Sequence, residues 1–358
     1  MKVASARFKE AVNKAIKGAG FNNLIPLTQL IGIKLSNGKL RFLTTDAAHN
    51  VCVIVDKVTG DDLDVTLDAD KFGKLISKVT SDEIELTVQD SVLVIKANGT
   101  YKMPLTIDEE GLVSFPDISS SAANVTIGLK LSSVLNAYNI NKAALSQTLD
   151  RPYLTGYYCK DRVITTNGDV ITFNNFKMFD GIDDAILLPA QLVQLLTLND
   201  KEDIVCNMSG DNLLFITDDV IIESHKQEGV EQYPADDILQ YLDEAFESSC
   251  KLPKELLLSV LDRLSLFIEQ YDKNGAYFTF GRTGLTIHSK KDASTEIINY
   301  IESNDFKPFS CLVDIPMLKE QLLSYPEDTV KLYYGNENAI KLECGKVVQV
   351  ISLLEEEA

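Results

Sequence analysis

One pattern of helix, acidic turn and three short strands occurs three times along the 358-residue chain. The copies occupy Phe72–Leu105, Leu192–Ser224 and Leu318–Leu354. In each copy, a short apolar helix pattern precedes a turn rich in Asp and Glu, and three alternating segments of strand length follow. The pattern recurs with a period of about 120 to 127 residues, far more than the roughly 20–50 residues of a solenoid unit. The repeating object is therefore a domain.

A second, looser pattern of one helix and two strands lies between these copies. Its helices are expected at Ala6–Ile16, Leu131–Ile140 and Leu256–Ile268, each followed by two strand-like segments. Leu43–Asp46 and Ile164–Asn167 stand at matching places in two of them. The sequence therefore predicts an α+β fold in which six half-domains pair into three similar domains. These domains are expected at residues 1–120, 121–249 and 250–358.

Two stretches mark the expected boundaries. Ser114–Asn124 contains Pro, Asp and a run of serines, and Gln232–Pro253 is acidic and in part compatible with helix. The third domain is expected to begin with Pro253 in the first turn of a helix over Lys254–Gln270. The acidic end of the chain, Glu355–Ala358, is most simply a solvated tail.

Composition and charge narrow the classes of function. With 45% hydrophobic and 24% charged residues, the chain is ordinary globular material. No apolar run approaches the roughly 18–20 residues of a membrane span, and the amphipathic N-terminus lacks a signal-peptide pattern, so we expect a cytoplasmic protein. The formal net charge of −19 argues against simple electrostatic binding of nucleic acid, unless one surface gathers the cations.

The sequence gives no sign of catalytic chemistry. Six cysteines are scattered without a C-x-x-C pair, and three histidines are isolated from one another. Acidic turns such as Asp61–Asp62 could bind Mg²⁺, but exposed turns are commonly acidic. A phosphate loop, a G-x-S-x-G elbow and an H-E-x-x-H motif are all absent from the sequence. We therefore expect no catalytic residues, no metal and no cofactor.

The second helix of the first domain separates apolar from basic residues. Over Asp70–Val79, apolar side chains at spacing i, i+3, i+4, i+7 form one stripe, and Lys71, Lys74 and Lys78 fall on the opposite face. Other predicted helices also carry Lys or Arg, whereas acidic residues gather in turns. A single lysine is more simply explained by a solvated helix face, so the prediction depends on the recurrence of the bias in several half-domains.

Three segments of the chain follow a known sequence pattern. Arg151–Ile171, RPYLTGYYCKDRVITTNGDVI, is similar to a stretch R-x-x-L-x-G followed by T-D-G-x-R-L; Leu40–Asn50 is similar to an L-x-x-T-D segment, and Val347–Leu353 to a closing strand. In this order, and with the threefold repeat, nearly the whole chain resembles the bacterial-type DNA polymerase sliding clamp, the DNA polymerase III beta subunit. The resemblance implies three DNA-clamp domains, each with two helices packed on antiparallel sheets, and a ring closed by a head-to-tail dimer.

The resemblance implies that the basic helix faces and one loop line the hole of this ring. A modestly basic lining, separated from DNA by water, attracts the duplex without fixing its register. The residues expected there are Lys9, Lys14, Lys17, Lys71, Lys74, Lys78, Lys142, Lys201, Lys254, Arg263 and Lys319 on helices or just after them, with Arg151 and Tyr153 on a loop.

The resemblance also implies two protein-binding surfaces. A subunit joint would bring one strand of the first domain against one helix region of the third, although ordinary core packing explains the same residues. The joint residues are Tyr101 and Met103 in one chain, and Leu266 and Phe267 in the other. The residues of a cleft for short partner peptides are Leu154, Thr166, Asn167, Gly168, Val170, Ile171, Val347, Val348, Val350 and Ile351. The peptide preference is expected to differ, because Asn167–Val170 stands where relatives have D-G-H-R, and Gln349–Val350 where they have Met-Pro.

These expectations together indicate a DNA sliding clamp, a processivity factor without catalytic activity. As a homodimer it would encircle double-stranded DNA without sequence specificity, tether the replicative DNA polymerase and other replication and repair proteins, and be opened by an ATP-driven clamp loader. Two alternatives stay open. One is a clamp-fold interaction scaffold that does not encircle DNA, and the other is a metal-dependent enzyme that uses the acidic turns.

Overall fold

The computed structural model describes residues 1–109, 111–118, 123–179, 181–242, 246–267, 275–290 and 293–355. These residues form seven α-helices and five antiparallel sheets, which confirms the predicted α+β class. They divide into two compact units: unit 1 comprises residues 1–132 and 191–226, and unit 2 comprises residues 133–190 and 227–358. The units cut across the threefold repeat, so the three domains at 1–120, 121–249 and 250–358 stay a prediction.

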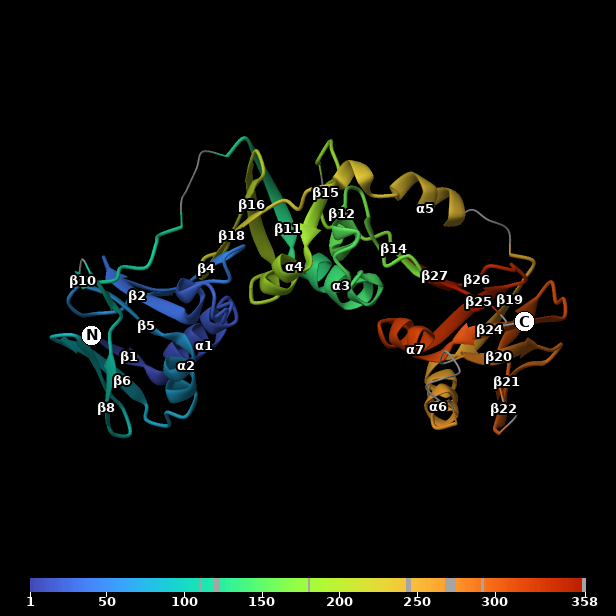
Figure 1. Ribbon diagram of the computed structural model, residues 1–358, viewed down its shortest axis with the longest axis horizontal. Helices are drawn as coiled ribbons and strands as arrows, with labels where there is room; N and C mark the ends of the chain where they lie inside the picture. Colours follow the sequence, from blue (N-terminus) through green and yellow to red (C-terminus); the bar gives the residue numbers. More distant parts are fainter. Residues whose placement is uncertain are drawn as a thin grey trace. The chain divides into compact units, whose positions relative to one another are not determined.

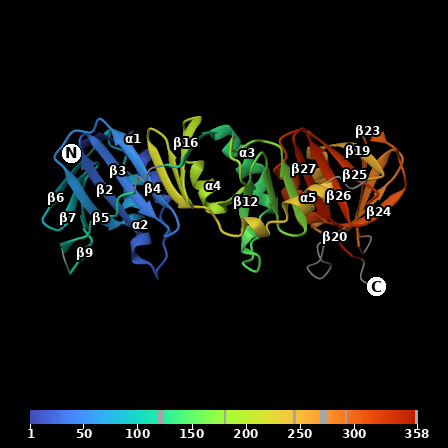
Figure 2. The same cartoon turned by 90° about the horizontal axis from the view of Figure 1, so that it is seen from above.

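Unit 1 is built on an eight-stranded sheet in the order β11-β16-β17-β18-β4-β3-β2-β5. Its strands are β2 (Leu30–Ser36), β3 (Lys39–Thr45), β4 (Asn50–Asp56), β5 (Leu63–Asp68), β11 (Val125–Lys130), β16 (Asp203–Ser209), β17 (Asn212–Ile216) and β18 (Val220–His225). Figure 2 shows β2, β3 and β4 side by side. A second sheet, ordered β1-β6-β7-β8, contains β1 (Lys2–Ala4), β6 (Glu83–Gln89), β7 (Val92–Lys96) and β8 (Thr100–Pro104). The hairpin of β9 (Ile107–Asp108) and β10 (Gly111–Leu112) follows.

Helices α1 (Ser5–Ile16) and α2 (Ala69–Ser77) pack against each other and against the large sheet of unit 1 (Figure 1). The Phe8 ring, fully buried, meets the rings of Phe42 and Phe72 edge-on, at centroid distances of 5.1 and 6.1 Å. The Asp68 carboxylate caps α2 by accepting the N–H of Lys71 at 2.7 Å. The predicted stripe thus packs inward, and the basic face of α2 stays exposed. Helix α4 (Ala190–Leu196) also buries its leucines.

Unit 2 contains a nine-stranded sheet in the order β15-β12-β13-β14-β27-β26-β25-β19-β23 and a four-stranded sheet, β22-β21-β20-β24. The strands of the first are β12 (Gly156–Cys159), β13 (Val163–Thr166), β14 (Val170–Asn174), β15 (Ile186–Pro189), β19 (Ser248–Pro253), β23 (Glu302–Asn304), β25 (Thr329–Tyr334), β26 (Ala339–Cys344) and β27 (Val347–Ser352). Those of the second are β20 (Gly275–Phe280), β21 (Gly284–Ser289), β22 (Thr295–Asn299) and β24 (Phe309–Asp314).

The helices of unit 2 are α3 (Leu131–Asn141), α5 (Ala235–Leu242), α6 (Lys254–Ser265) and α7 (Ile315–Leu323), and α6 packs against α7. Four 3₁₀ turns are η1 (Pro26–Gln29), η2 (Lys142–Ala144), η3 (Pro152–Thr155) and η4 (Val230–Gln232).

The two large sheets have the same internal order. In unit 1, β5-β2-β3-β4 meets β18-β17-β16-β11, and in unit 2, β15-β12-β13-β14 meets β27-β26-β25-β19. We call the pairing of β4 with β18 the unit 1 junction, and the pairing of β14 with β27 the unit 2 junction. Each junction is an antiparallel pair between segments more than a hundred residues apart in the chain.

The turns that precede the two junctions are also equivalent. Thr45 Oγ1 donates to the carbonyl of His49 at 2.9 Å, and Thr166 Oγ1 donates to the carbonyl of Val170 at 2.7 Å. Asp46, in the first turn, accepts backbone N–H groups from the second and third residues after it, and Asn167 does the same in the second turn. The matching places inferred for these two segments are confirmed.

One predicted helix was right at its start and wrong at its end. Helix α6 begins at Lys254 as predicted, although Pro253 is its extended N-cap residue and not part of its first turn. Helix α6 ends at Ser265 and not at Gln270. Parts of four predicted segments lie outside the described residues: 119–122 and 243–245 of the linkers, 268–270 of the helix and 356–358 of the tail. No helix in the described ranges combines the length and apolarity needed to cross a membrane.

Candidate functional site

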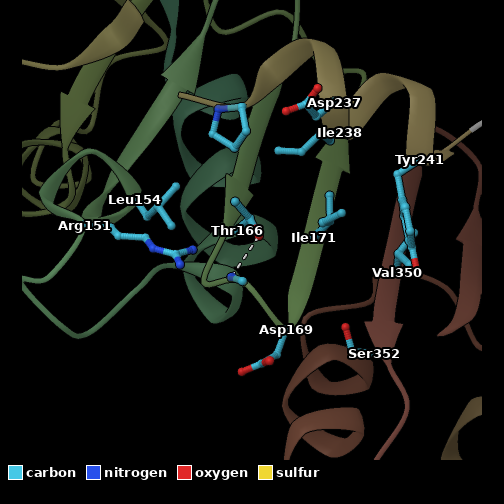
Figure 3. Close-up of a pocket in the computed structure, with 12 residues that line it drawn as sticks. Arg151, Leu154, Thr166, Asp169, Ile171, Asp237, Ile238, Tyr241, Val350 and Ser352 are labelled. Carbon is cyan, nitrogen blue, oxygen red and sulfur yellow. Dashed lines mark hydrogen bonds between the residues drawn. The ribbon is translucent and has the colours of Figure 1, made fainter. Parts of the chain in front are cut away.

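Unit 2 contains a pocket of about 310 Å³ beside its junction (Figure 3). The base is apolar and comes from Leu154 of η3, Ile171 of β14 and Val350 of β27, the last two directly opposite each other in the sheet. Pro234, just before α5, closes one side. The volume lies at the lower end of the range typical of sites for small ligands, and an apolar base with a few polar groups is their usual composition.

The turn between β13 and β14 forms a second wall. Thr166 Oγ1 accepts the N–H of Gly168 at 3.1 Å while donating to Val170, and Gly168 has φ +104°, a conformation that favours glycine. Asn167 Oδ1 accepts the N–H groups of Asp169 and Val170 at 3.0 and 2.8 Å. The turn is therefore fixed by its own hydrogen bonds, and it holds the Asp169 carboxylate at the rim of the pocket (Figure 3).

Helix α5 forms the third wall and is anchored by the tyrosine that precedes it. The hydroxyl of Tyr233 donates to the carbonyl of Ile164 at 3.1 Å, and its ring stacks on that of Tyr158 with centroids 4.9 Å apart. Burial raises the pKa of Tyr233, so the hydroxyl stays protonated and continues to donate. The side chains that α5 gives to the pocket are Asp237, Ile238 and Tyr241 (Figure 3).

The rim carries charge of both signs. Arg151, which is exposed, lies on the same side as Leu154, while Asp169 and Asp237 come from the turn and from α5 (Figure 3). Apolar side chains at the base can take up an apolar side chain of a ligand, and the rim can pair with its polar groups. An extended peptide with apolar anchors has this combination.

Five residues predicted for a partner cleft line this pocket: Leu154, Thr166, Gly168, Ile171 and Val350. Val170, Val347 and Ile351 are instead buried on the opposite face of the sheet, because side chains alternate along a strand. Asn167 serves the turn, and Val348 lies opposite Phe173, further along the strand pair. The structure therefore brings together half of the predicted cleft.

Sequence reasoning missed the side of the pocket formed by α5. Pro234, Asp237, Ile238 and Tyr241 belong to the acidic stretch that was expected to be a domain boundary. A usable signal was present, because Ala235, Ile238 and Leu242 have the i, i+3, i+7 spacing of an amphipathic helix. Arg151, predicted at the DNA-facing loop, also lines the pocket.

The cations predicted to line a DNA channel divide into two groups. Those that are exposed and make no ion pair within the described ranges are Lys17, Lys71, Lys78, Lys142, Lys201 and Arg151. The others are engaged within the chain. Lys9 and Lys254 donate to backbone carbonyls, Lys14 contacts Glu10, Asp200 and Asp219, Lys74 pairs with Asp70, Arg263 with Glu296 and Lys319 with Asp262. Tyr153 is half-buried against the cluster around Leu154.

The residues predicted for a subunit joint differ in exposure. Leu266 and Phe267, just after α6, are 80% and 50% exposed, which is unusual for large apolar side chains. Met103 is buried in its own sheet opposite Leu93, whereas Tyr101 is half-exposed. Strand β8, which carries both, has no partner on its outer edge among the described strands.

Comparison with known proteins places this fold in one class. No protein-family model and no curated protein matches the sequence. Solved structures match over the full length, and the class they define is the DNA polymerase sliding clamp: the clamp from Bacillus subtilis has a TM-score of 0.86 and 16% identity, with 99% of each chain covered. More particularly, the fold is that of the DNA polymerase III beta subunit. The protein of that name from Borrelia burgdorferi, in complex with a natural product, has a TM-score of 0.89 and 17% identity over 99% of each chain. A putative one from Eubacterium rectale has 0.84 and 17% identity, covering 99% of this chain and 98% of that one.

Proposed function

We propose that this chain is a DNA sliding clamp: a non-catalytic processivity factor that encircles duplex DNA as a head-to-tail homodimer and tethers a replicative polymerase. The observation that carries the proposal is the match in fold to DNA polymerase III beta subunits over 99% of the chain. A partial match would be compatible with a reused domain, but a match that covers 99% of both chains favours the same assembly. An ATP-driven loader would open the ring.

The basic face of α2 supports the proposed DNA contact. Lys71 and Lys78 are exposed without an ion pair in the described part of the chain, and Lys74 holds only the neighbouring Asp70 at 2.6 Å. An exposed pair of this kind is weak and screened by salt, so Lys74 can exchange its partner for a phosphate at little cost. Because the lysines attract phosphates without reading bases, this surface suits a ring that moves along DNA.

Exposed apolar residues support the proposed subunit joint. Leu266 and Phe267 of one protomer would cover the outer edge of β8 in its partner, next to Tyr101. Burying the exposed parts of these two side chains contributes about 2–4 kcal/mol, because full burial is worth about 1.5–3 kcal/mol each and Phe267 is already half-buried. A Leu266→Ala, Phe267→Ala variant should therefore be monomeric by light scattering at concentrations where the parent is dimeric.

The pocket of unit 2 supports the proposed tether. Its apolar base of Leu154, Ile171 and Val350 suits the apolar anchors of a peptide from a polymerase or another replication protein. A Val350→Asp variant should lose binding of such a peptide, because a carboxylate would have to be desolvated at the base of the pocket. In a titration followed by NMR, the cognate peptide would change the chemical shifts of the methyl groups of Ile171 and Ile238, which line the same pocket.

A threading experiment tests the ring without a loader. A duplex is blocked at one end by a bound protein, the clamp is added so that a ring can pass over the free end, and that end is then blocked too. We expect the protein to survive a high-salt wash on the doubly blocked duplex and to leave when a restriction enzyme cuts it, because retention by enclosure does not depend on ionic contacts. Duplex with one end left free is the control.

Charge reversal separates the role of the lysines from that of the ring. Lys71→Glu, Lys74→Glu and Lys78→Glu together should slow threading, most strongly at low salt, whereas the same change at Lys57, Lys96 and Lys160, which belong to strand ends and turns, should not. Loss of protein from the doubly blocked duplex at high salt would contradict enclosure. It would favour the clamp-fold scaffold, which the internal pairing of Lys14, Arg263 and Lys319 also favours.

A further inference from the structure

Unit 1 has a hollow of about 230 Å³ on the outer face of its own junction. The floor is formed by Leu43 of β3, Cys52 and Ile54 of β4, and Ile221 of β18, which come together because β3, β4 and β18 are neighbours in the sheet. Burial raises the pKa of Cys52 to about 12, so the thiol is neutral and the floor carries no charge. The walls are formed by Lys39, Arg41, Asp117 and Ile118.

Comparison with the equivalent place in unit 2 explains why the hollow exists. The equivalent turns place Cys52 of β4 where β14 has Phe173, and Arg41 of β3 where the β12–β13 turn has Arg162. In unit 2, Arg162 lies over the Phe173 ring at 5.3 Å and pairs with Asp161. In unit 1, a thiol replaces the ring, and the space that the ring fills in unit 2 stays open.

The lining residues carry a net positive charge, because two cations, Lys39 and Arg41, stand against one acid, Asp117. Asp117 lies 3.2 Å from Lys34 Nζ, which also contacts Asp64 at 3.6 Å. Arg41 is half-buried, and the side chains of Arg41 and Lys39 make no hydrogen bond or ion pair with any residue in the described ranges. A half-buried guanidinium whose donors have no side-chain partner in the described part of the chain favours a carboxylate from a binding partner.

The same face already holds one extended segment. After β10 the chain crosses it, and Phe115 is buried against Leu43 and Cys52. An added Cβ at Gly32 of β2 would lie 2.4 Å from the Cβ of Phe115. Strand β2 must therefore have glycine at this position for the segment to approach. Ile118, three residues further on, forms a wall of the hollow. The face is thus suited to extended chain with apolar side chains pointing toward the sheet.

We propose that this hollow is a second peptide-binding site, which takes an extended segment of a partner protein with an apolar side chain next to a carboxylate. The apolar side chain would lie on Leu43, Ile54 and Ile221, and the carboxylate would pair with Arg41 and Lys39 at the rim. The volume is below the roughly 300 Å³ at which sites for drug-sized ligands begin, so the hollow suits one or two side chains of a peptide and not a whole metabolite. The positive charge of Arg41 and Lys39 favours a partner segment that is acidic.

Isoleucine methyl NMR of the full chain tests the proposal in a single titration. The probe is an eight-residue peptide with two leucines flanked by aspartates, and its matched control has asparagines in their place. We expect saturable changes in the chemical shifts of the methyl groups of Ile54, Ile118 and Ile221, which line the hollow. The methyl groups of Ile171 and Ile238 report separately on the pocket of unit 2.

Substitution of the arginine tests the charge. Arg41→Gln should weaken binding at the hollow by about two- to fivefold, as should the asparagine peptide, because each removes a partly exposed charge pair. Arg41→Lys should retain most of the affinity, and Arg282→Gln, the same change at an exposed turn of unit 2, should have no effect. Thermal melts of each variant confirm that the fold is intact.

Two results would overturn the proposal. One is no shift at Ile54, Ile118 and Ile221, whether or not Ile171 and Ile238 respond. The other is binding at the hollow that Arg41→Gln leaves unchanged. Neither result affects the clamp function proposed above, because enclosure of DNA is measured by threading and not by this peptide.

Discussion

The two junctions of the molecule share one backbone arrangement and differ in what fills it. At the unit 2 junction, Val170 and Ile351 lie side by side on the inner face, fully buried in a core that includes α6 and α7. At the unit 1 junction, the equivalent positions hold His49 and Ser224, which are also buried and are joined by a contact of 2.8 Å between Nδ1 and Oγ.

This difference separates what specifies the junction from what stabilises it. The hydrogen bonds of the Thr45 and Thr166 turns and the register of the paired strands are the same in both units, so they specify the arrangement. The side chains at the centre then stabilise it by different means. The apolar pair contributes through area removed from water, whereas the polar pair depends on one hydrogen bond and on the protonation of an imidazole.

The largest effect is expected from a cavity at the unit 2 junction. Ile351→Ala should cost about 2–5 kcal/mol of stability, because the side chain is fully buried and the surrounding core relaxes only in part. Hydrogen exchange at the amides of β14 and β27 measures the loss. Val348→Ala on the same strand is the control, since that side chain is half-exposed and should cost far less. Unchanged protection in β14 would contradict a stabilising role for the apolar pair.

A smaller loss is expected when the hydrogen bond of the unit 1 junction is removed. Ser224→Ala leaves a buried imidazole nitrogen without this partner, which typically costs about 1–3 kcal/mol. Replacing both partners, as His49→Leu with Ser224→Ala, should recover most of that loss, because an apolar pair of similar volume then fills the site as in unit 2. Urea unfolding of the three proteins measures both steps. If the double variant were less stable than Ser224→Ala alone, the equivalence of the two junctions would be wrong.

Acid should weaken the unit 1 junction selectively. Burial lowers the pKa of His49 and the charge of His225 acts in the same direction, while Asp46 opposes them. Because the folded pKa lies below the unfolded one, the unfolded chain binds the proton more readily. The contribution of neutral His49 to the stability of the fold is therefore complete above about pH 6.5, and it is lost as the pH falls from there toward the folded pKa.

Protection of the β4 and β18 amides against hydrogen exchange, corrected for the intrinsic exchange rate, should thus decrease as the pH is lowered from about 7 to about 5.5. The amides of β14 and β27 should keep their protection over the same range. The variant His49→Leu with Ser224→Ala should abolish the difference. Equal losses in both units, or a pH response that survives in the double variant, would mean that other groups titrate.

The sequence predicted those elements whose two faces differ. The stripe of α2 packs as expected, because this helix buries one side only. Strand β4 was missed, since VCVIVD is a nearly continuous apolar run with buried residues on both faces and has no period to detect.

The candidate site was predicted only where it follows the repeat. Transfer of positions by resemblance found Leu154 and Val350 but added Val170 and Ile351, because it ignored the alternation of side chains that sends neighbouring strand residues to opposite faces. The α5 wall belongs to a connection between repeats, and no second copy existed from which to infer it.

The smallest effect distinguishes the two equivalent arginines. Arg162→Gln should cost about 0.5–1 kcal/mol, since it removes a contact with the Phe173 ring and a partly exposed pair with Asp161. Arg41→Gln should change stability by no more than about 0.5 kcal/mol, because its guanidinium has no partner in the described ranges. Paired urea titrations measure the difference. A loss at Arg41 as large as that at Arg162 would mean that the chain itself uses this charge, which would remove the reason to expect a carboxylate from a partner beside Cys52.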